Sequence, residues 1–153
     1  MAYVTPLTIL NTYLAALRAW EGEPLASCVF RKGPQRTIRM SAAQDTICIV
    51  ALRALEGGEV SAGSGNNWWH DWSFAVLLMV KDDETDPEAS EDTRLDLIEQ
   101  FGQCQHQMAV RTMEGAKVGH ITACTLGIGE YFENSTQIFR YAEIVVTYKT
   151  LRS

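Results

Sequence analysis

Residues 137–151 read QIFRYAEIVVTYKTL, and this alternating stretch decides the fold. Its apolar side chains recur at every second position, which is the period of a β-strand. The residues expected on one face are Ala142, Ile144, Val146 and Tyr148, and those on the other are Tyr141, Val145 and Thr147. Residues 118–128 alternate in the same way, and Asn134 and Ser135 lie in the turn between the two stretches. The pattern predicts an antiparallel hairpin.

More strands are predicted ahead of this hairpin. Residues 72–81 (WSFAVLLMVK) are nearly all apolar, which predicts a central strand covered on both faces. Residues 46–53 (TICIVALR) are rich in β-branched side chains and predict another strand. Residues 56–67, between the two, are rich in Gly, Ser and Asn and predict a loop.

A short hairpin is expected nearer the N-terminus. Residues 27–30 and 37–40 read as two brief strands on either side of Lys32-Gly33-Pro34-Gln35, which is a turn signal. The tip of this hairpin would carry a run of basic side chains.

Two helices complete the layout. Thr5 and Pro6 suit a helix start, and Gly22 and Pro24 suit its end. The apolar stripe expected between them is Leu7, Leu10, Leu14 and Leu17, widened by Ile9, Tyr13 and Trp20. A second helix is predicted from Pro87 to near Met113. Its expected cap is Asp86 or Ser90, and its expected apolar face is Leu97, Phe101, Cys104 and Met108.

This order of elements predicts an α+β fold, a mainly antiparallel β-sheet packed by an N-terminal helix and one central helix. The 153 residues fit a single domain spanning residues 1–153. The longest strictly apolar run, residues 74–80, is far too short to cross a bilayer, so no membrane partner is expected.

The charges are sorted into two blocks. Residues 82–99 hold nine acids and one base, Arg94, whereas residues 28–40 hold four bases and no acid. The acids are Asp82, Asp83, Glu84, Asp86, Glu88, Glu91, Asp92, Asp96 and Glu99, and the bases are Arg31, Lys32, Arg36 and Arg39. The acidic block is either a solvated helix entrance or a contact patch. The net charge of −6 argues against tight nucleic-acid binding, because phosphate contacts need Lys and Arg.

No motif for catalysis or for a metal or other cofactor is found. Cys104 and His106 are two residues apart, and such residues on a helix point away from each other. The four cysteines (Cys28, Cys48, Cys104 and Cys124) are expected to be buried and reduced. We therefore expect a protein that works by contact and is not an enzyme. The alternative from another class is a small soluble enzyme that uses His120 or Cys104.

Three tryptophans lie within residues 68–72 (WWHDW). They either pack inward at the start of the central strand or serve as interface anchors, because an indole buries a large area. The residues expected at a subunit or partner interface are Arg31, Lys32, Arg36, Arg39, Trp68, Trp69, Trp72, Asp82, Asp83, Glu84 and Asp86. Opposed charge patches on one molecule favour head-to-tail contact between copies.

With this layout, the chain resembles the tail terminator proteins of long-tailed bacteriophages, which are also described as minor tail or head–tail joining proteins. The resemblance rests on the opening helix from Thr5 to Trp20, on the acid-led helix around residues 94–101 (RLDLIEQF), and on the closing strand, residues 139–149 (FRYAEIVVTYK). It is one of layout and length and covers most of the chain, but the segment 56–71 has no counterpart in it.

The resemblance implies a structural virion protein of the tail or neck, assembled in the host cytoplasm. It implies a homohexameric ring that caps the tail tube and ends its growth. The partners would be the tail tube protein and the head-side connector or neck proteins, and a contractile sheath is a further partner that the family allows. DNA would pass through the ring without specific binding, and no cofactor is implied. Another phage head- or tail-completion or connector protein of similar size is the nearest alternative.

Overall fold

The structure is a computed structural model, and it describes residues 5–41, 43–54, 59–62, 68–110, 116–133 and 135–152. Its elements in chain order are α1 (Pro6–Arg18), a short 3-10 turn η1 (Leu25–Ser27), β1 (Val29–Lys32), β2 (Thr46–Ala54), β3 (Glu59–Ala62), β4 (Trp68–Lys81), α2 (Pro87–Val110), β5 (Ala116–Glu130) and β6 (Ile138–Arg152). The predicted α+β class is confirmed.

The described strands form one sheet with the order β1-β2-β4-β6-β5, and β3 pairs with β4 beside this path. All pairs are antiparallel except β1 with β2, which is parallel. The predicted hairpin is confirmed, because β5 pairs with β6 over nearly its whole length. The predicted central strand is also confirmed, since β4 lies between β2 and β6.

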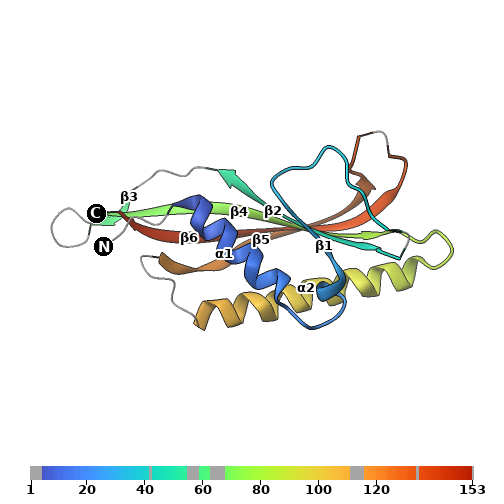
Figure 1. Cartoon of the computed structure of the whole chain (residues 1–153), viewed down its shortest axis with the longest axis horizontal. Coiled ribbons are helices and arrows are strands. Elements are labelled where there is room, and N and C mark those ends of the chain that lie inside the picture. Colours follow the sequence, from blue (N-terminus) through green and yellow to red (C-terminus); the bar gives the residue numbers. More distant parts are fainter. Residues whose placement is uncertain are drawn as a thin grey trace.

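Both helices lie on one face of the sheet, as Figure 1 shows. Helix α1 packs over β1 and β2, and α2 packs over β4, β6 and β5. The larger core lies between the helices and the sheet, and it contains the predicted face of β6, from Ala142 to Tyr148. Inside it, Tyr13 donates a hydrogen bond to Gln105 and so joins α1 to α2.

A smaller core lies on the opposite face. It contains Ile47, Met79 and Phe139, and it is covered by the segment between β1 and β2 and by the β5–β6 turn (Figure 1). Ile38 and Met40 of that segment pack against it. The prediction that the central strand is covered on both faces therefore holds for the C-terminal half of β4.

The helix starts follow the sequence signals. Thr5 caps α1 by accepting a hydrogen bond from the amide of Thr8 at 3.2 Å, and Asp86 accepts one from the amide of Ala89 at 3.1 Å. Helix α1 ends at Arg18, earlier than Gly22 and Pro24 suggest. Leu7 departs from the predicted stripe and is 57% exposed, whereas Leu10, Leu14 and Leu17 are buried as predicted.

The short hairpin predicted near the N-terminus is wrong. Residues 37–40 form no strand, and β1 pairs in parallel with β2 instead. Gly33 adopts a φ of +80°, which other residues rarely tolerate, and its amide donates to the carbonyl of Val50 at 2.8 Å. The chain turns away from the sheet there and crosses to the opposite face, as a parallel neighbour requires.

Two further expectations need correction. The loop predicted at residues 56–67 contains β3, which pairs with β4. The long strand β4 begins at Trp68 and not at Trp72, so the backbone of the tryptophan cluster belongs to a strand. Among the cysteines, Cys28, Cys48 and Cys104 are buried and free as expected, but Cys124 is exposed because β5 is an edge strand.

Leu17 and Leu7 provide a matched test of this packing. Leu17 is fully buried and Leu7 is exposed, although both are leucines of α1. We expect Leu17→Ala to lower the free energy of unfolding by about 2–5 kcal/mol, since it opens a cavity in the core. Leu7→Ala should change it by less than about 0.5 kcal/mol. Denaturant unfolding measures both values, and equal losses would contradict the placement of α1.

Candidate interaction site

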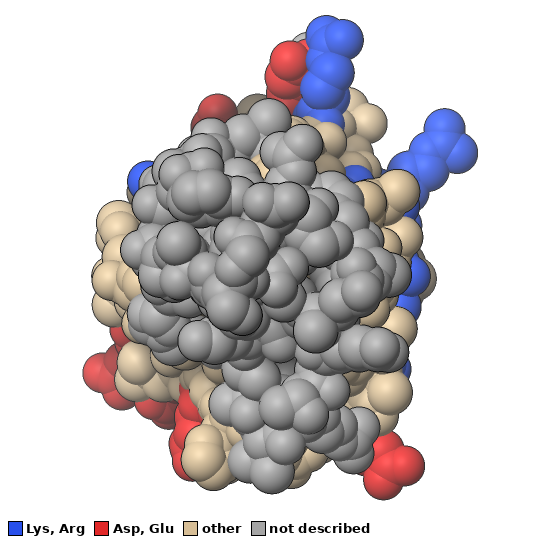
Figure 2. Space-filling model, turned by 90° about the vertical axis from the view of Figure 1, so that its left-hand side faces the viewer, with Lys and Arg blue, Asp and Glu red and all other residues tan. Residues whose placement is uncertain are grey.

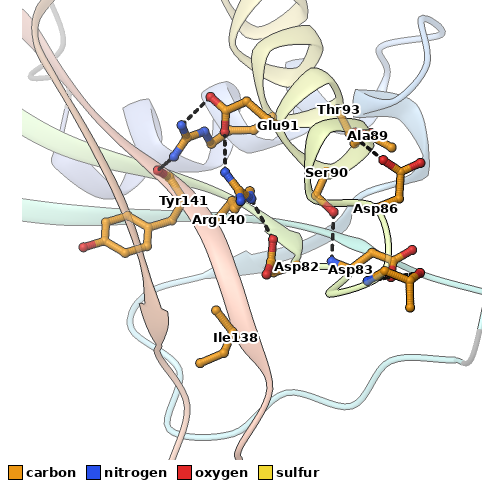
Figure 3. A network of polar contacts seen from close by, with 12 residues as sticks. Asp82, Asp83, Asp86, Ala89, Ser90, Glu91, Thr93, Ile138, Arg140 and Tyr141 are labelled. Atoms are coloured by element: carbon orange, nitrogen blue, oxygen red, sulfur yellow. Dashed lines mark hydrogen bonds and ion pairs between the residues drawn. The ribbon is translucent and has the colours of Figure 1, made fainter.

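A network of charged groups joins the start of α2 to the sheet (Figure 3). The carboxylate of Glu91 accepts hydrogen bonds from two arginines. Arg94 Nη2 donates to one oxygen at 2.5 Å, and Arg140 Nη1 donates to the other at 3.0 Å. Arg140 also donates through Nε to Asp82 at 2.7 Å. This charged network of Asp82, Glu91, Arg94 and Arg140 links the end of β4, α2 and β6.

Arg94 is the buried member of the network, with 8% of its side chain exposed. Its Nη1 donates to the carbonyls of Gly127 at 3.2 Å and Tyr141 at 3.4 Å, so it also bridges β5 and β6. Because a buried cation is costly without an anion, Glu91 is needed to hold Arg94 in place. The hydrogen bond from Arg94, together with that from Arg140, lowers the pKa of Glu91.

The acids of the acidic block therefore differ in the contacts that they make. Asp82 and Glu91 have cationic partners inside the chain, so the expectation of an unpaired solvated block fails for these two. Asp83 accepts hydrogen bonds from Thr85, which lower its pKa, and Asp86 caps α2. Asp83 and Asp86 are exposed, as are the remaining acids Glu84, Glu88, Asp92, Asp96 and Glu99.

The basic block is divided as well. Arg36 forms an exposed ion pair with Glu133 at 3.0 Å, next to the β5–β6 turn. Arg31 and Arg39 lie elsewhere, around a surface hollow of roughly 390 Å³ beside β1. Arg18, at the end of α1, lines the same hollow. Lys32 is exposed and donates to Asn11 of α1 at 3.2 Å.

The tryptophans predicted as anchors are placed only in part. Trp72 is 8% exposed and packs in the larger core, which favours the inward alternative for this residue. Trp68 and Trp69 pair through their backbones with β6, but their side chains lie outside the described residues. No ion pair joins the acidic block to the basic block within the described part of the chain.

Surface hollows, the thiol of Cys104 and possible metal ligands are the features that bear on catalysis or metal binding. A hollow of roughly 750 Å³ lies between the start of α2 and residues 43–46, and it is lined mainly by small and polar side chains. Burial raises the pKa of Cys104 to about 11, which keeps it a protonated thiol near neutral pH. No group of His, Cys, Asp and Glu suited to a metal occurs among the described residues. The side chain of His120 lies outside them.

Sequence reasoning missed several exposed apolar side chains at the sheet edges. Leu95 on α2 is 49% exposed, and Leu126 and Ile128 on β5 are 50% and 55% exposed. Leu52 on β2 is 38% exposed. The alternation of residues 118–128 was the available signal, but it does not say whether a helix covers the apolar face.

Comparisons with known proteins give no assignment. No protein-family model matches the sequence, and no match was found among curated proteins. Neither α1 nor α2, as described, is long and apolar enough to cross a membrane.

The network predicts an asymmetry between two substitutions. Glu91→Gln leaves the buried Arg94 without its carboxylate, so we expect a loss of about 2–3 kcal/mol in the free energy of unfolding. Arg94→Met removes the buried charge itself, while Glu91 keeps Arg140, so the loss should be smaller. Glu88→Gln, at an exposed position of α2, is the control. Denaturant unfolding measures the three losses. If Arg94→Met lowers the free energy of unfolding more than Glu91→Gln does, this role for Glu91 is wrong.

The lowered pKa of Glu91 also predicts a pH dependence. A carboxylate whose pKa is lower in the folded state stabilises that state above its unfolded pKa, about 4.3 for Glu. This stability is lost as the pH falls through the folded pKa. The difference in unfolding free energy between the wild type and Glu91→Gln should therefore be constant above about pH 5 and shrink below about pH 4. A difference independent of pH from 7 to 3 would contradict this role.

Proposed function

We propose that the protein is a structural assembly subunit, a tail-terminator-like protein that forms a ring at the end of a phage tail tube. One observation carries the proposal. The acids of α2 lie over the half of the sheet that ends at β5, and the bases of β1, Arg31 and Lys32, lie at the opposite edge.

Opposite charges on opposite halves of one sheet favour contact between unlike surfaces of identical copies. Such a head-to-tail contact repeats from copy to copy and closes into a ring when the rotation allows. A two-fold contact would instead bring like charges together, which is unfavourable. The resemblance rests on an opening helix, an acid-led helix and a closing strand, and α1, α2 and β6 are those three elements.

The proposed ring would join the tail tube to the head-side connector and let DNA pass. A net charge of −6 suits passage, because like charge keeps DNA from adhering. A hexamer is the ring size that the resemblance implies. The proposed place of the protein is the virion, at the tail or neck.

Mass measurement tests the proposal. We expect native mass spectrometry and light scattering to find ring-sized oligomers, either free in solution or at the ends of purified phage tail tubes. Electron microscopy should show tubes of defined length when the protein is present. A protein that stays monomeric and never binds tube ends would overturn the proposal.

A further inference from the structure

Three apolar side chains lie exposed where α2 crosses the edge strand β5. The hydrogen bond from Arg94 to the carbonyl of Gly127 places this crossing, because Leu95 follows Arg94 and Gly127 stands between Leu126 and Ile128. Leu126 pairs with Ala142, whose side chain points into the core under the helices. Leu126 therefore lies on the helix face of β5, but half of it remains exposed.

Acids border these apolar side chains. Asp92 precedes Leu95 by three residues and Glu99 follows it by four, so all three share one stripe of α2. Both acids are exposed. We name the set Asp92, Leu95, Glu99, Leu126 and Ile128 the acidic edge. An exposed apolar patch with a charged rim is typical of a protein-binding surface.

The backbone of β5 adds to this surface. Within the described residues β5 pairs with β6 alone and ends the sheet. No strand pairs with its other side among the described residues, although β5 runs from Ala116 to Glu130. Edge strands of this length usually carry some protection against pairing, or they meet a partner.

The opposite edge of the sheet has the complementary chemistry. Arg18 and Arg39 are exposed and line the hollow beside β1 together with Arg31. Leu52 lies on β2 beyond Val50, the last residue of β2 that β1 covers, and is partly exposed. We name the set Arg18, Arg31, Lys32, Arg39 and Leu52 the basic edge.

Figure 2 views the molecule along its length, from one end. Lys and Arg project mainly at the upper and right margins, with acidic side chains beside them at the top, and most of the visible Asp and Glu lie along the lower margin. The lower margin is the side of the helices in Figure 1. Most of the acids visible from this end therefore lie on the helix side of the molecule.

We infer that the acidic edge of one copy docks on the basic edge of a second copy. This inference rests on the proposed ring and identifies the surfaces that would form it. A second copy is the expected partner because the two edges are complementary. The acidic edge carries acids and exposed leucines, and the basic edge carries arginines and a leucine. Two acidic edges would repel each other, so the contact is head-to-tail.

Charge reversal with rescue tests the contact. One double variant, Asp92→Arg with Glu99→Arg, reverses the acidic edge, and another, Arg18→Glu with Arg39→Glu, reverses the basic edge. Each variant alone should self-associate at least about tenfold more weakly than the wild type, because like charges then meet. An equimolar mixture should reassemble, because each edge again finds an opposite charge. Native mass spectrometry, with and without tail tubes, gives the readout.

The control is a swap on the open face of the sheet. Arg53 and Glu143 form an exposed ion pair there at 3.2 Å, and neither residue belongs to the acidic or the basic edge. The variant Arg53→Glu with Glu143→Arg also changes two charges and should assemble as the wild type does. Circular dichroism and thermal unfolding check that each variant is folded, and Leu126→Ser should weaken assembly without any change of charge.

The outcomes separate this inference from the proposed function. If the wild type forms rings and both reversed variants form the same rings, these edges do not dock on each other. The proposed ring would then still stand. Two reversed variants that stay apart when mixed would also overturn the docking of these edges. A wild-type protein that never assembles, even with tube ends, would overturn both proposals.

Discussion

The pairing of β4 with β6 is the constraint on which the rest of the structure depends. Each of the 14 residues of β4 has a partner on β6, without a register shift. This unbroken ladder puts Trp72, Phe74 and Val76 beside Tyr148, Val146 and Ile144 in the larger core. A slip of one residue would turn each of these side chains to the opposite face, so the register is strongly determined. The ladder also separates the two sheet edges, because β2 and β1 extend from one side of it and β5 from the other.

The charged network sets the position of α2 on this ladder. Arg94 reaches carbonyls of both β5 and β6, and Glu91 ties it to Arg140 on β6. A buried ion pair contributes little net stability but penalises arrangements that separate the partners. The network thus explains why the acid-led start of α2 lies over the end of β4, where Asp82 closes the chain of contacts. It also withdraws Asp82 and Glu91 from the set of charges that a partner could use.

The sequence predicted the long elements well and the short ones poorly. The strand at residues 137–151 and both helix starts were correct because periodicity and capping act locally. The hairpin at residues 27–40 was wrong because Ile38 and Met40 pack on the smaller core instead of pairing. The sequence around Gly33 indicates a turn. Whether the chain then pairs back in a hairpin or crosses to the other face depends on the pairing of the whole sheet. β3 was missed because its four residues gain their pairing from the N-terminal extension of β4.

Charged residues that are neighbours in the sequence do not always share one surface of the folded chain. Arg36 and Arg39 are three residues apart, yet one pairs with Glu133 near the β5–β6 turn and the other lies beside β1. Leu126 alternates like a core residue but remains exposed, because α2 runs over the ladder and leaves the outer part of β5 uncovered. The useful property is therefore the position of each charge relative to the sheet edges. A parallel β1 at one end and an uncovered β5 at the other make the two edges different, and identical copies can meet through different edges only in a head-to-tail series.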